Sequence, residues 1–180
     1  MKQKEGKFFS GGKTFQKEKI NYMHPALSPD GNTLYFACND PEGWGGYDLW
    51  SVQRSNRSES GWDEPKLLSR NINTPGNEVF PAFSADTLYF ASDGLQGMGG
   101  LDIFRTYKSD RNAWAPPHNL KPPVNSGADD FGFIALPVPK REGPAKPGDL
   151  LRAGFFTSNR PAGSRGGDDI YRFEQRVPPP

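Results

Sequence analysis

One hexapeptide pattern occurs three times in this chain, and it constrains the fold more than any other feature of the sequence. Each copy has two glycines, a variable residue, an aspartate, an aliphatic residue and an aromatic residue. The copies begin at Gly45, Gly99 and Gly166, so they follow one another at comparable intervals. A pattern repeated in this way indicates a series of similar supersecondary units. The glycines are Gly45, Gly46, Gly99, Gly100, Gly166 and Gly167, and the aspartates are Asp48, Asp102 and Asp169.

Other segments recur in a fixed order around the hexapeptide. A strand-like aromatic segment precedes each copy, and a shorter segment precedes that one. After the first two copies come a tryptophan, a leucine and an Ile/Val-Asn pair. These signals predict four short strands in a complete unit of roughly 50 residues. The aromatic segments are residues 33–38, 87–92 and 153–158, the shorter segments are residues 24–28, 80–84 and 131–135, and the downstream residues are Trp62, Leu67 and Ile72-Asn73, then Trp114, Leu120 and Val124-Asn125.

The pair Ile20-Asn21 fits the same series near the start of the chain. Asn21, Asn73 and Asn125 are equally spaced in the sequence. Because the later Asn residues end their units, we interpret residues 14–21 as the last strand of a unit whose beginning is missing.

The composition is compatible with a fold made of strands. Hydrophobic residues make up only 34% of the chain, but 4 Trp, 6 Tyr and 13 Phe can bury a large area. With 21 Gly and 18 Pro, the chain has many residues that favour tight turns. No segment has the i, i+3, i+4, i+7 apolar spacing of an amphipathic helix. We therefore predict an all-β chain, with Trp62 and Trp114 buried at equivalent positions.

The repeats also define the expected domain organisation. We expect residues 14–174 to form antiparallel sheets, one from each unit. The third unit carries an insertion at residues 137–151, where the other units have a turn between their first two strands. The units are residues 24–72, 80–124 and 131–174, preceded by a disordered N-terminal end (1–13) and followed by a Pro-rich tail or linker (175–180).

Charge and hydropathy exclude several classes of partner. The net charge is +1, from 22 basic and 21 acidic residues, which does not favour binding to nucleic acid. No apolar run approaches the roughly 20 residues of a membrane helix, so we expect no direct membrane insertion. The first residues contain no apolar segment of the signal-peptide type. The single cysteine, Cys38, lies in a strand-like segment and is expected to be a small core residue.

Three runs of the first unit occur in a characteristic order: Pro-Ala-Leu-Ser-Pro-Asp-Gly at 25–31, Leu-Tyr-Phe-Ala at 34–37 and Gly-Gly-Tyr-Asp-Leu-Trp at 45–50. This order resembles the WD40-like (PD40) repeat of TolB-type β-propellers. The downstream Trp, Leu and Ile-Asn residues are similar to the propeller segment of bacterial envelope proteins. Such segments often precede an OmpA-like peptidoglycan-binding domain, and some belong to the type IX secretion machinery. The resemblance covers about residues 14–174 and departs from the pattern at the first turn of units two and three.

This resemblance implies β-propeller blades and a non-catalytic role in binding proteins or glycans of the cell envelope. The partners implied are secretion or peptidoglycan-associated components. The implied location is the periplasm or the outer membrane, if the chain is part of a longer precursor. No OmpA-like sequence is present, so peptidoglycan binding is not carried over to this chain.

Three blades are fewer than the four to eight that typical propellers contain. Two arrangements follow from this shortage. The chain is a segment of a longer propeller, which we favour, or two copies form a head-to-tail homodimer. In the second arrangement, residues 14–21 of one copy complete the last sheet of the other and remove its open edge.

The recurring aspartates have two interpretations. They form a ring of carboxylates around a channel or cation, or each caps a turn by accepting backbone N–H bonds. Recurrence in every unit favours capping, because an active site is usually asymmetric. The pairs Asp129-Asp130 and Asp168-Asp169 raise the alternative of a propeller-fold glycoside hydrolase, lyase or peptidase-associated protein. Turn or surface carboxylates are the simpler interpretation.

Other candidate chemistry is weaker. His24, His118 and Cys38 lack the spacing of zinc ligands. The glycine-rich residues 94–100 precede a strand and not a helix, so they should not bind phosphate. We therefore expect no catalytic residue, no metal and no cofactor.

The loops before the glycine pairs carry the candidate binding residues. Trp44, Met98 and Arg165 lie directly before a glycine pair, and Arg160 lies in the same loop of the third unit. Exposed aromatic and Arg side chains on loops are common binding anchors. Local packing over the glycine turn is the alternative.

Overall fold

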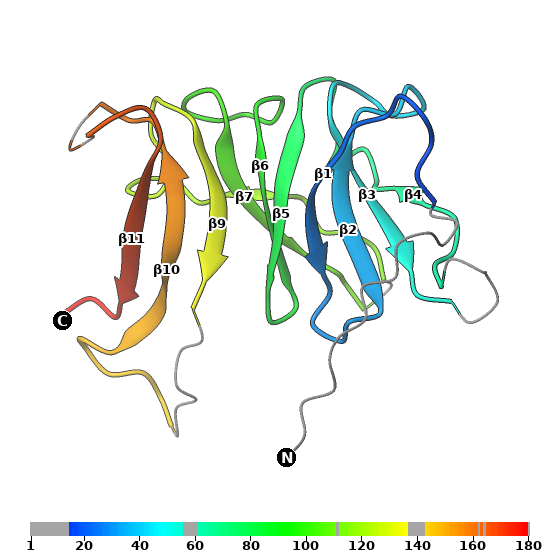
Figure 1. Ribbon diagram of the computed structural model, residues 1–180. Coiled ribbons are helices and arrows are strands. Elements are labelled where there is room, and N and C mark those ends of the chain that lie inside the picture. The colour runs from blue at the N-terminus through cyan, green and yellow to red at the C-terminus, as the bar shows by residue number, and fades with distance from the viewer. Residues whose placement is uncertain are drawn as a thin grey trace, which may run out of the picture.

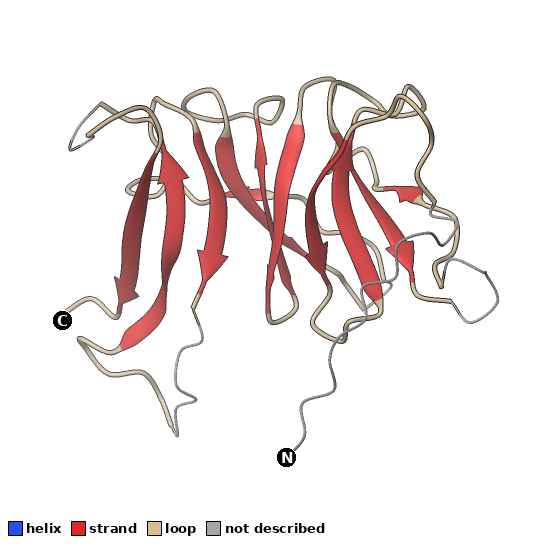
Figure 2. Ribbon diagram, viewed as in Figure 1, coloured by secondary structure: helices blue, strands red, loops and turns tan. Residues whose placement is uncertain are grey.

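The computed structural model describes residues 15–55, 61–110, 112–136, 143–161, 163 and 165–179. Within these residues the regular structure is eleven β-strands and no helix, which confirms the all-β prediction (Figure 2). The strands are β1 (Tyr22–Leu27), β2 (Thr33–Cys38), β3 (Asp48–Gln53), β4 (Lys66–Leu67), β5 (Glu78–Ser84), β6 (Thr87–Ser92), β7 (Asp102–Tyr107), β8 (His118–Asn119), β9 (Asp130–Ala135), β10 (Leu150–Ser158) and β11 (Asp169–Arg176).

The strands form three antiparallel sheets, each made of strands that are consecutive in the sequence (Figure 1). Sheet 1 contains β1–β4, sheet 2 contains β5–β8 and sheet 3 contains β9–β11. The prediction that each unit forms one antiparallel sheet is confirmed. The third unit contributes three strands.

The hexapeptides occupy equivalent positions in the three sheets. Their aspartates begin β3, β7 and β11, and each is paired with the last residue of the preceding aromatic strand. Two residues later, the aromatic residue of each hexapeptide lies opposite an aromatic residue. Such cross-strand pairs stabilise a sheet and fix its register. The pairs are Phe36 with Trp50, Phe90 with Phe104, and Phe156 with Tyr171.

The first strand of each sheet has the same irregularity. His24, Phe80 and Gly132 have left-handed backbones, with φ angles of 53°, 53° and 63°. The register between the first and second strands shifts at these residues. A bulge of this kind bends a strand and increases its twist. The three first strands therefore share one shape.

In the described part of the chain the sheets stand in an open row (Figure 1). The first strands β1, β5 and β9 are neighbours, and one face of each sheet packs on the next sheet. We call the contact of sheets 1 and 2 the first seam, and that of sheets 2 and 3 the second seam. The first seam buries Tyr35, Leu49, Leu88 and Phe90, and the second buries Tyr89, Ile103, Phe133 and Phe156.

The prediction of a strand at residues 14–21 is wrong for residues 15–21, the part that the structure describes. Residues 15–21 form no strand, and β11 is bonded only to β10 among the named strands. Instead, the ring of Phe15 stacks on Phe36 with centroids 5.2 Å apart, and Lys17 is ion-paired with Asp40 at 2.7 Å. The segment forms no strand for two reasons. Its apolar side chains pack on the outer face of sheet 1, and the left-handed backbone of Lys19 (φ 65°) interrupts an extended conformation.

The series of Asn residues also needs correction. The backbone N–H of Asn21 donates to the side chain of Asn39 at 2.8 Å. Asn77 makes this bond to Asp93, and Asp129 makes it to Asn159. Asn21 is therefore equivalent to Asn77 and Asp129, and not to Asn73 and Asn125. The equal spacing in the sequence led to the wrong position for Asn21, because the loop before sheet 1 differs from the loops before sheets 2 and 3.

Three smaller predictions have mixed outcomes. Cys38 is buried, as expected. Trp62 and Trp114 do occupy equivalent positions, but they are only half-buried, because each lies at a sheet edge beneath a cation, Arg54 or Lys108.

The predicted terminal segments and the insertion are tested only in part. The insertion does connect β9 to β10, although residues 137–142 lie outside the described residues. The tail begins later than predicted, since β11 extends to Arg176. The predicted disordered end, residues 1–13, also lies outside the described residues.

Candidate functional site

The aspartate of each hexapeptide caps the loop that precedes it. Asp48 accepts the backbone N–H groups of Trp44 and Gly45 at 2.8 and 3.1 Å. Asp102 accepts those of Met98 and Gly99 at 2.6 and 3.1 Å. In the third loop, Asp169 accepts the N–H of Arg165 at 2.8 Å. These bonds fix the loops that carry the candidate binding residues.

A buried asparagine fastens each seam. The side chain of Asn73 accepts the N–H of Leu49 at 2.8 Å and donates to its carbonyl at 3.0 Å. Asn125 makes the same two bonds to Ile103, at 2.9 and 2.8 Å. The amide thus satisfies a backbone N–H that would otherwise be left unpaired in the interior, and it shares the carbonyl of the same residue with the N–H of Leu68 or Leu120. We call Asn73 and Asn125 the clamp residues.

The glycine pairs allow the loop after each clamp residue to approach closely. A methyl group added to Gly45 would lie 2.5 Å from the carbonyl oxygen of Gly76, and one on Gly99 would lie 2.1 Å from that of Ala128. Either distance is far below van der Waals contact, so both positions require glycine. In contrast, a methyl group on Gly166 or Gly167 would meet no atom within 4 Å.

The first seam opens into a cleft at the end that carries the glycine loops. The cleft has a volume of about 370 Å³ and is lined by Trp44, Arg70, Asn73, Thr74, Pro75 and Gly94. The Trp44 side chain is 40% exposed, and the guanidinium of Arg70 lies 3.8 Å from the centre of its ring. We call this space the Trp44 cleft. Its main polar group is therefore a cation held over an aromatic face.

The second seam carries an arginine, Arg160, in the equivalent loop. Asn159 is equivalent to Asp93, so Arg160 takes the position of Gly94. Its guanidinium donates to Asp130 and to the carbonyl oxygen of Val124. It also lies 5.0 Å from the ring centres of both Phe156 and Tyr171. The arginine therefore adds side-chain contacts within the second seam that Gly94 cannot make in the first.

This comparison separates the four predicted binding residues. Trp44 and Met98 are 40% and 44% exposed, and Arg165 is exposed in the third loop. Arg160 is largely engaged within the seam, so its role as a binding anchor stays a prediction that the structure does not favour. Sequence reasoning missed Arg70, which lies in the loop before a clamp residue and has no counterpart in the repeat pattern.

Buried acids begin the first strands of sheets 2 and 3. Glu78 accepts bonds from the N–H and the hydroxyl of Thr74 at 2.8 and 2.7 Å, and from the hydroxyl of Ser92 at 2.7 Å. Burial raises the pKa of Glu78, and the nearby Asp48 adds to this effect. The equivalent acid in sheet 3, Asp130, has the guanidinium of Arg160 beside it. The two seams thus differ in charge at equivalent positions.

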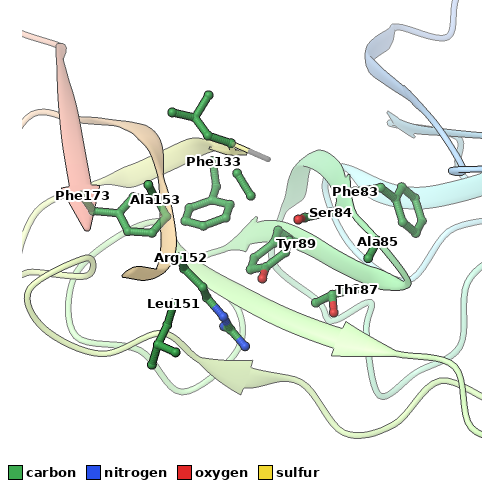
Figure 3. Close-up of a pocket in the computed structure, with 12 residues that line it drawn as sticks. Phe83, Ser84, Ala85, Thr87, Tyr89, Phe133, Leu151, Arg152, Ala153 and Phe173 are labelled. Atoms are coloured by element: carbon green, nitrogen blue, oxygen red, sulfur yellow. The ribbon is translucent and has the colours of Figure 1, made fainter. Parts of the chain in front are cut away.

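A larger cavity lies at the other end of the second seam (Figure 3). It has a volume of about 580 Å³, and the rings of Tyr89, Phe133 and Phe173 are among the side chains that line it. These rings are stacked on one another, with centroids 4.4 and 5.0 Å apart. The faces of these rings are therefore largely covered. A sugar stacks on an open aromatic face, so the cavity does not favour a sugar. A cavity of about 430 Å³, bordered by Tyr35, lies at the equivalent place in the first seam, so these cavities belong to the architecture.

The residues considered for catalysis have structural contacts. His24 stacks on Phe80 with ring centroids 3.6 Å apart, and burial lowers the pKa of this histidine. Asp129 accepts the N–H of Leu101 at 2.8 Å, and its neighbour Asp130 is paired with Arg160. Within the residues that the structure describes, no group of three or more His, Cys, Asp or Glu could hold a metal ion.

Comparisons with known proteins add no family to this description. No family model matches the sequence, and no curated protein matches it either. Over the described ranges, no helix is long and apolar enough to cross a membrane. A function for this chain therefore rests on its own sheets, seams and Trp44 cleft.

Proposed function

We propose that this chain is a non-catalytic scaffold of β-propeller blades that binds a protein partner in the bacterial cell envelope. Three features support the propeller architecture. Each sheet is a meander of consecutive strands, the first strands of the sheets are neighbours, and each sheet packs on the next in sequence. Blades of a propeller are arranged in this way around a central axis. The resemblance to the TolB-type repeat supports the same architecture.

The Trp44 cleft carries the binding part of the proposal. Features that recur in each unit serve the fold, so a functional site should be sought where equivalent positions differ. The cleft is lined by Gly94, whereas the second seam has Arg160 at the equivalent position. Trp and Arg are the residues most enriched at binding hot spots, and here Trp44 and Arg70 are in direct contact.

The chemistry of the cleft favours a protein over a glycan. Arg70 covers one face of the Trp44 ring, which removes a face on which a sugar would stack. Its guanidinium offers hydrogen-bond donors to a carboxylate or a backbone carbonyl of a partner. The partner class, secretion or peptidoglycan-associated proteins of the periplasm or outer membrane, rests on the resemblance alone.

Paired substitutions at equivalent loop positions test this function. The Trp44→Ala variant should lose capture of the partner from an envelope extract by about 30-fold, the effect of losing a hot-spot residue worth about 2 kcal/mol. The Met98→Ala variant removes the equivalent side chain of the second loop and should capture the partner normally. Both variants should melt at the wild-type temperature. Equal capture by both variants, or turnover of a glycoside or peptide substrate by the protein, would contradict the proposal.

A further inference from the structure

The outer face of sheet 3 is built like the faces that are buried in the seams. On this face, Phe155 lies opposite Ile134, and Thr157 lies opposite Ile170. Ile134 is 59% exposed and Ile170 is 77% exposed, whereas the residues equivalent to Ile170, Leu49 and Ile103, are fully buried. The apolar side chain has been kept in the third unit although no described residue covers it.

The third glycine pair leads to the same conclusion independently. In the first two units the glycines are required because the loop of the next sheet lies against them. Gly166 and Gly167 repeat this pair, although a methyl group on either would have open space. Nothing in the described part of sheet 3 requires glycine there, whereas an approaching loop of the same kind would.

The two existing seams show what such a loop contains. Residues 73–78 read Asn-Thr-Pro-Gly-Asn-Glu, and residues 125–130 read Asn-Ser-Gly-Ala-Asp-Asp. The first residue is the clamp residue. The fifth accepts the N–H of Tyr47 or Leu101 through a side-chain oxygen, at 3.1 or 2.8 Å. The N–H of the sixth donates to the carbonyl of the same residue, at 2.6 Å in both seams.

We propose that the outer face of sheet 3 binds a further sheet of the same repeat, which enters through a loop of the pattern Asn-Ser/Thr-x-x-Asn/Asp-Asp/Glu. The first residue of that loop clamps the backbone of Ile170, and the fifth and sixth bond to the backbone of Asp168. The glycine pair Gly166-Gly167 receives the middle of the loop. This inference extends the proposed propeller architecture and is independent of binding at the Trp44 cleft.

Sheet 1 of a second copy does not fit this description. Counting back from Asn21, which is equivalent to Asn77, places Lys17 at the clamp position and Tyr22 at the position of the acid. The Lys17 amine is bound to Asp40 and Glu42 of its own sheet, at 2.7 and 3.0 Å. Residues 15–21 therefore cover the outer face of sheet 1 and lack the clamp that the face of sheet 3 requires.

An extended chain tests the proposal. Lys108 is equivalent to Gln175, so a copy of residues 108–176 joined after Glu174 supplies a fourth sheet with its own clamp loop. Hydrogen exchange of the Ile170 amide should slow by at least tenfold relative to the unextended protein. Two changes should restore fast exchange: Asn125→Ala in the added copy only, and Gly166→Ala. Unchanged exchange on extension, or slow exchange that survives both substitutions, would overturn the proposal.

A second measurement covers the case in which the extended chain does not fold. A fluorescent peptide of residues 113–131 is titrated against the unextended protein and against its Ile170→Lys variant, which alters a side chain that is already exposed. Binding weakened at least tenfold by the substitution supports the proposal, and no binding overturns it. Sedimentation of the unextended protein completes the test. A dimer that Ile170→Lys dissociates would assign the face to a second copy and also overturn the proposal.

Discussion

Alanine at equivalent glycines should change stability in opposite directions. Gly99 and Gly166 each begin a glycine pair, and neither has a left-handed backbone, so alanine fits the local conformation of both. They differ in what surrounds them. A methyl group on Gly99 would lie 2.1 Å from the Ala128 carbonyl oxygen, whereas one on Gly166 would have open space. The pair therefore isolates the effect of the neighbouring sheet.

The expected magnitudes follow from two opposing effects. Replacing glycine by alanine at a compatible position stabilises a protein by about 0.4–1 kcal/mol, because the unfolded chain loses freedom. Overpacking typically costs about 1–3 kcal/mol, and Gly99 should lie near the upper end because a backbone carbonyl must move by more than about 1 Å. We expect Gly99→Ala to lower the free energy of unfolding by about 2 kcal/mol and Gly166→Ala to raise it by up to about 1 kcal/mol.

Thermal and urea unfolding of the two variants measure this difference. For a chain of this size, the melting temperatures should differ by roughly 6–12 °C, with the wild type between them. Circular dichroism before heating should show the same strand content in all three proteins. If Gly99→Ala is as stable as Gly166→Ala, the close approach of the loop to the glycine pair does not explain the repeat.

Two further substitutions test the seams. Asn125→Ala should lower the free energy of unfolding by about 2–4 kcal/mol, because it leaves the buried N–H of Ile103 unsatisfied and removes three hydrogen bonds. The exposed Asn21 should tolerate alanine with little change, and equal losses of stability for the two variants in urea unfolding would argue against the clamp. Because the pKa of Glu78 is raised in the folded protein, its carboxyl group loses its proton at lower pH in the unfolded chain, and wild-type stability should fall as pH rises from about 4.3 towards the raised pKa. The Glu78→Gln variant should lose part of that fall, and parallel curves of stability against pH for the two proteins would refute the raised pKa of Glu78.

Local sequence signals located the strands but not the contacts between sheets. Residues 33–38 and 87–92 were predicted as strands with the bounds that the structure shows, since aromatic alternation and flanking turn residues are local signals. The reason for the glycine pair was not visible, because the atom that excludes a side chain belongs to the next sheet. Spacing alone also misplaced Asn21, since loop lengths change without affecting the strands.

The sequence likewise identified some residues of the candidate site and missed others. Trp44 was identified from its place before a glycine pair, and the structure shows it exposed at a cleft. Arg160 was identified from its place in the corresponding loop of the third unit, yet its side chain is engaged within the second seam, because the fold places it beside Asp130. Arg70 was missed since it lies far from Trp44 in the sequence, beyond β3 and β4, and no repeated pattern connects the two residues.

The clamp residues also set an order for folding during protein synthesis. Asn73 follows Leu49 by 24 residues and Asn125 follows Ile103 by 22, so sheets 1 and 2 each leave the ribosome before the residue that bonds to their third strand. At synthesis rates of about 5–20 residues per second, that delay is roughly 1–5 s. Nascent chains arrested before Asn73 should therefore be cleaved by protease within sheet 1, and longer ones should resist. During each such interval the emerging unit presents an apolar face to chaperones and to neighbouring nascent chains.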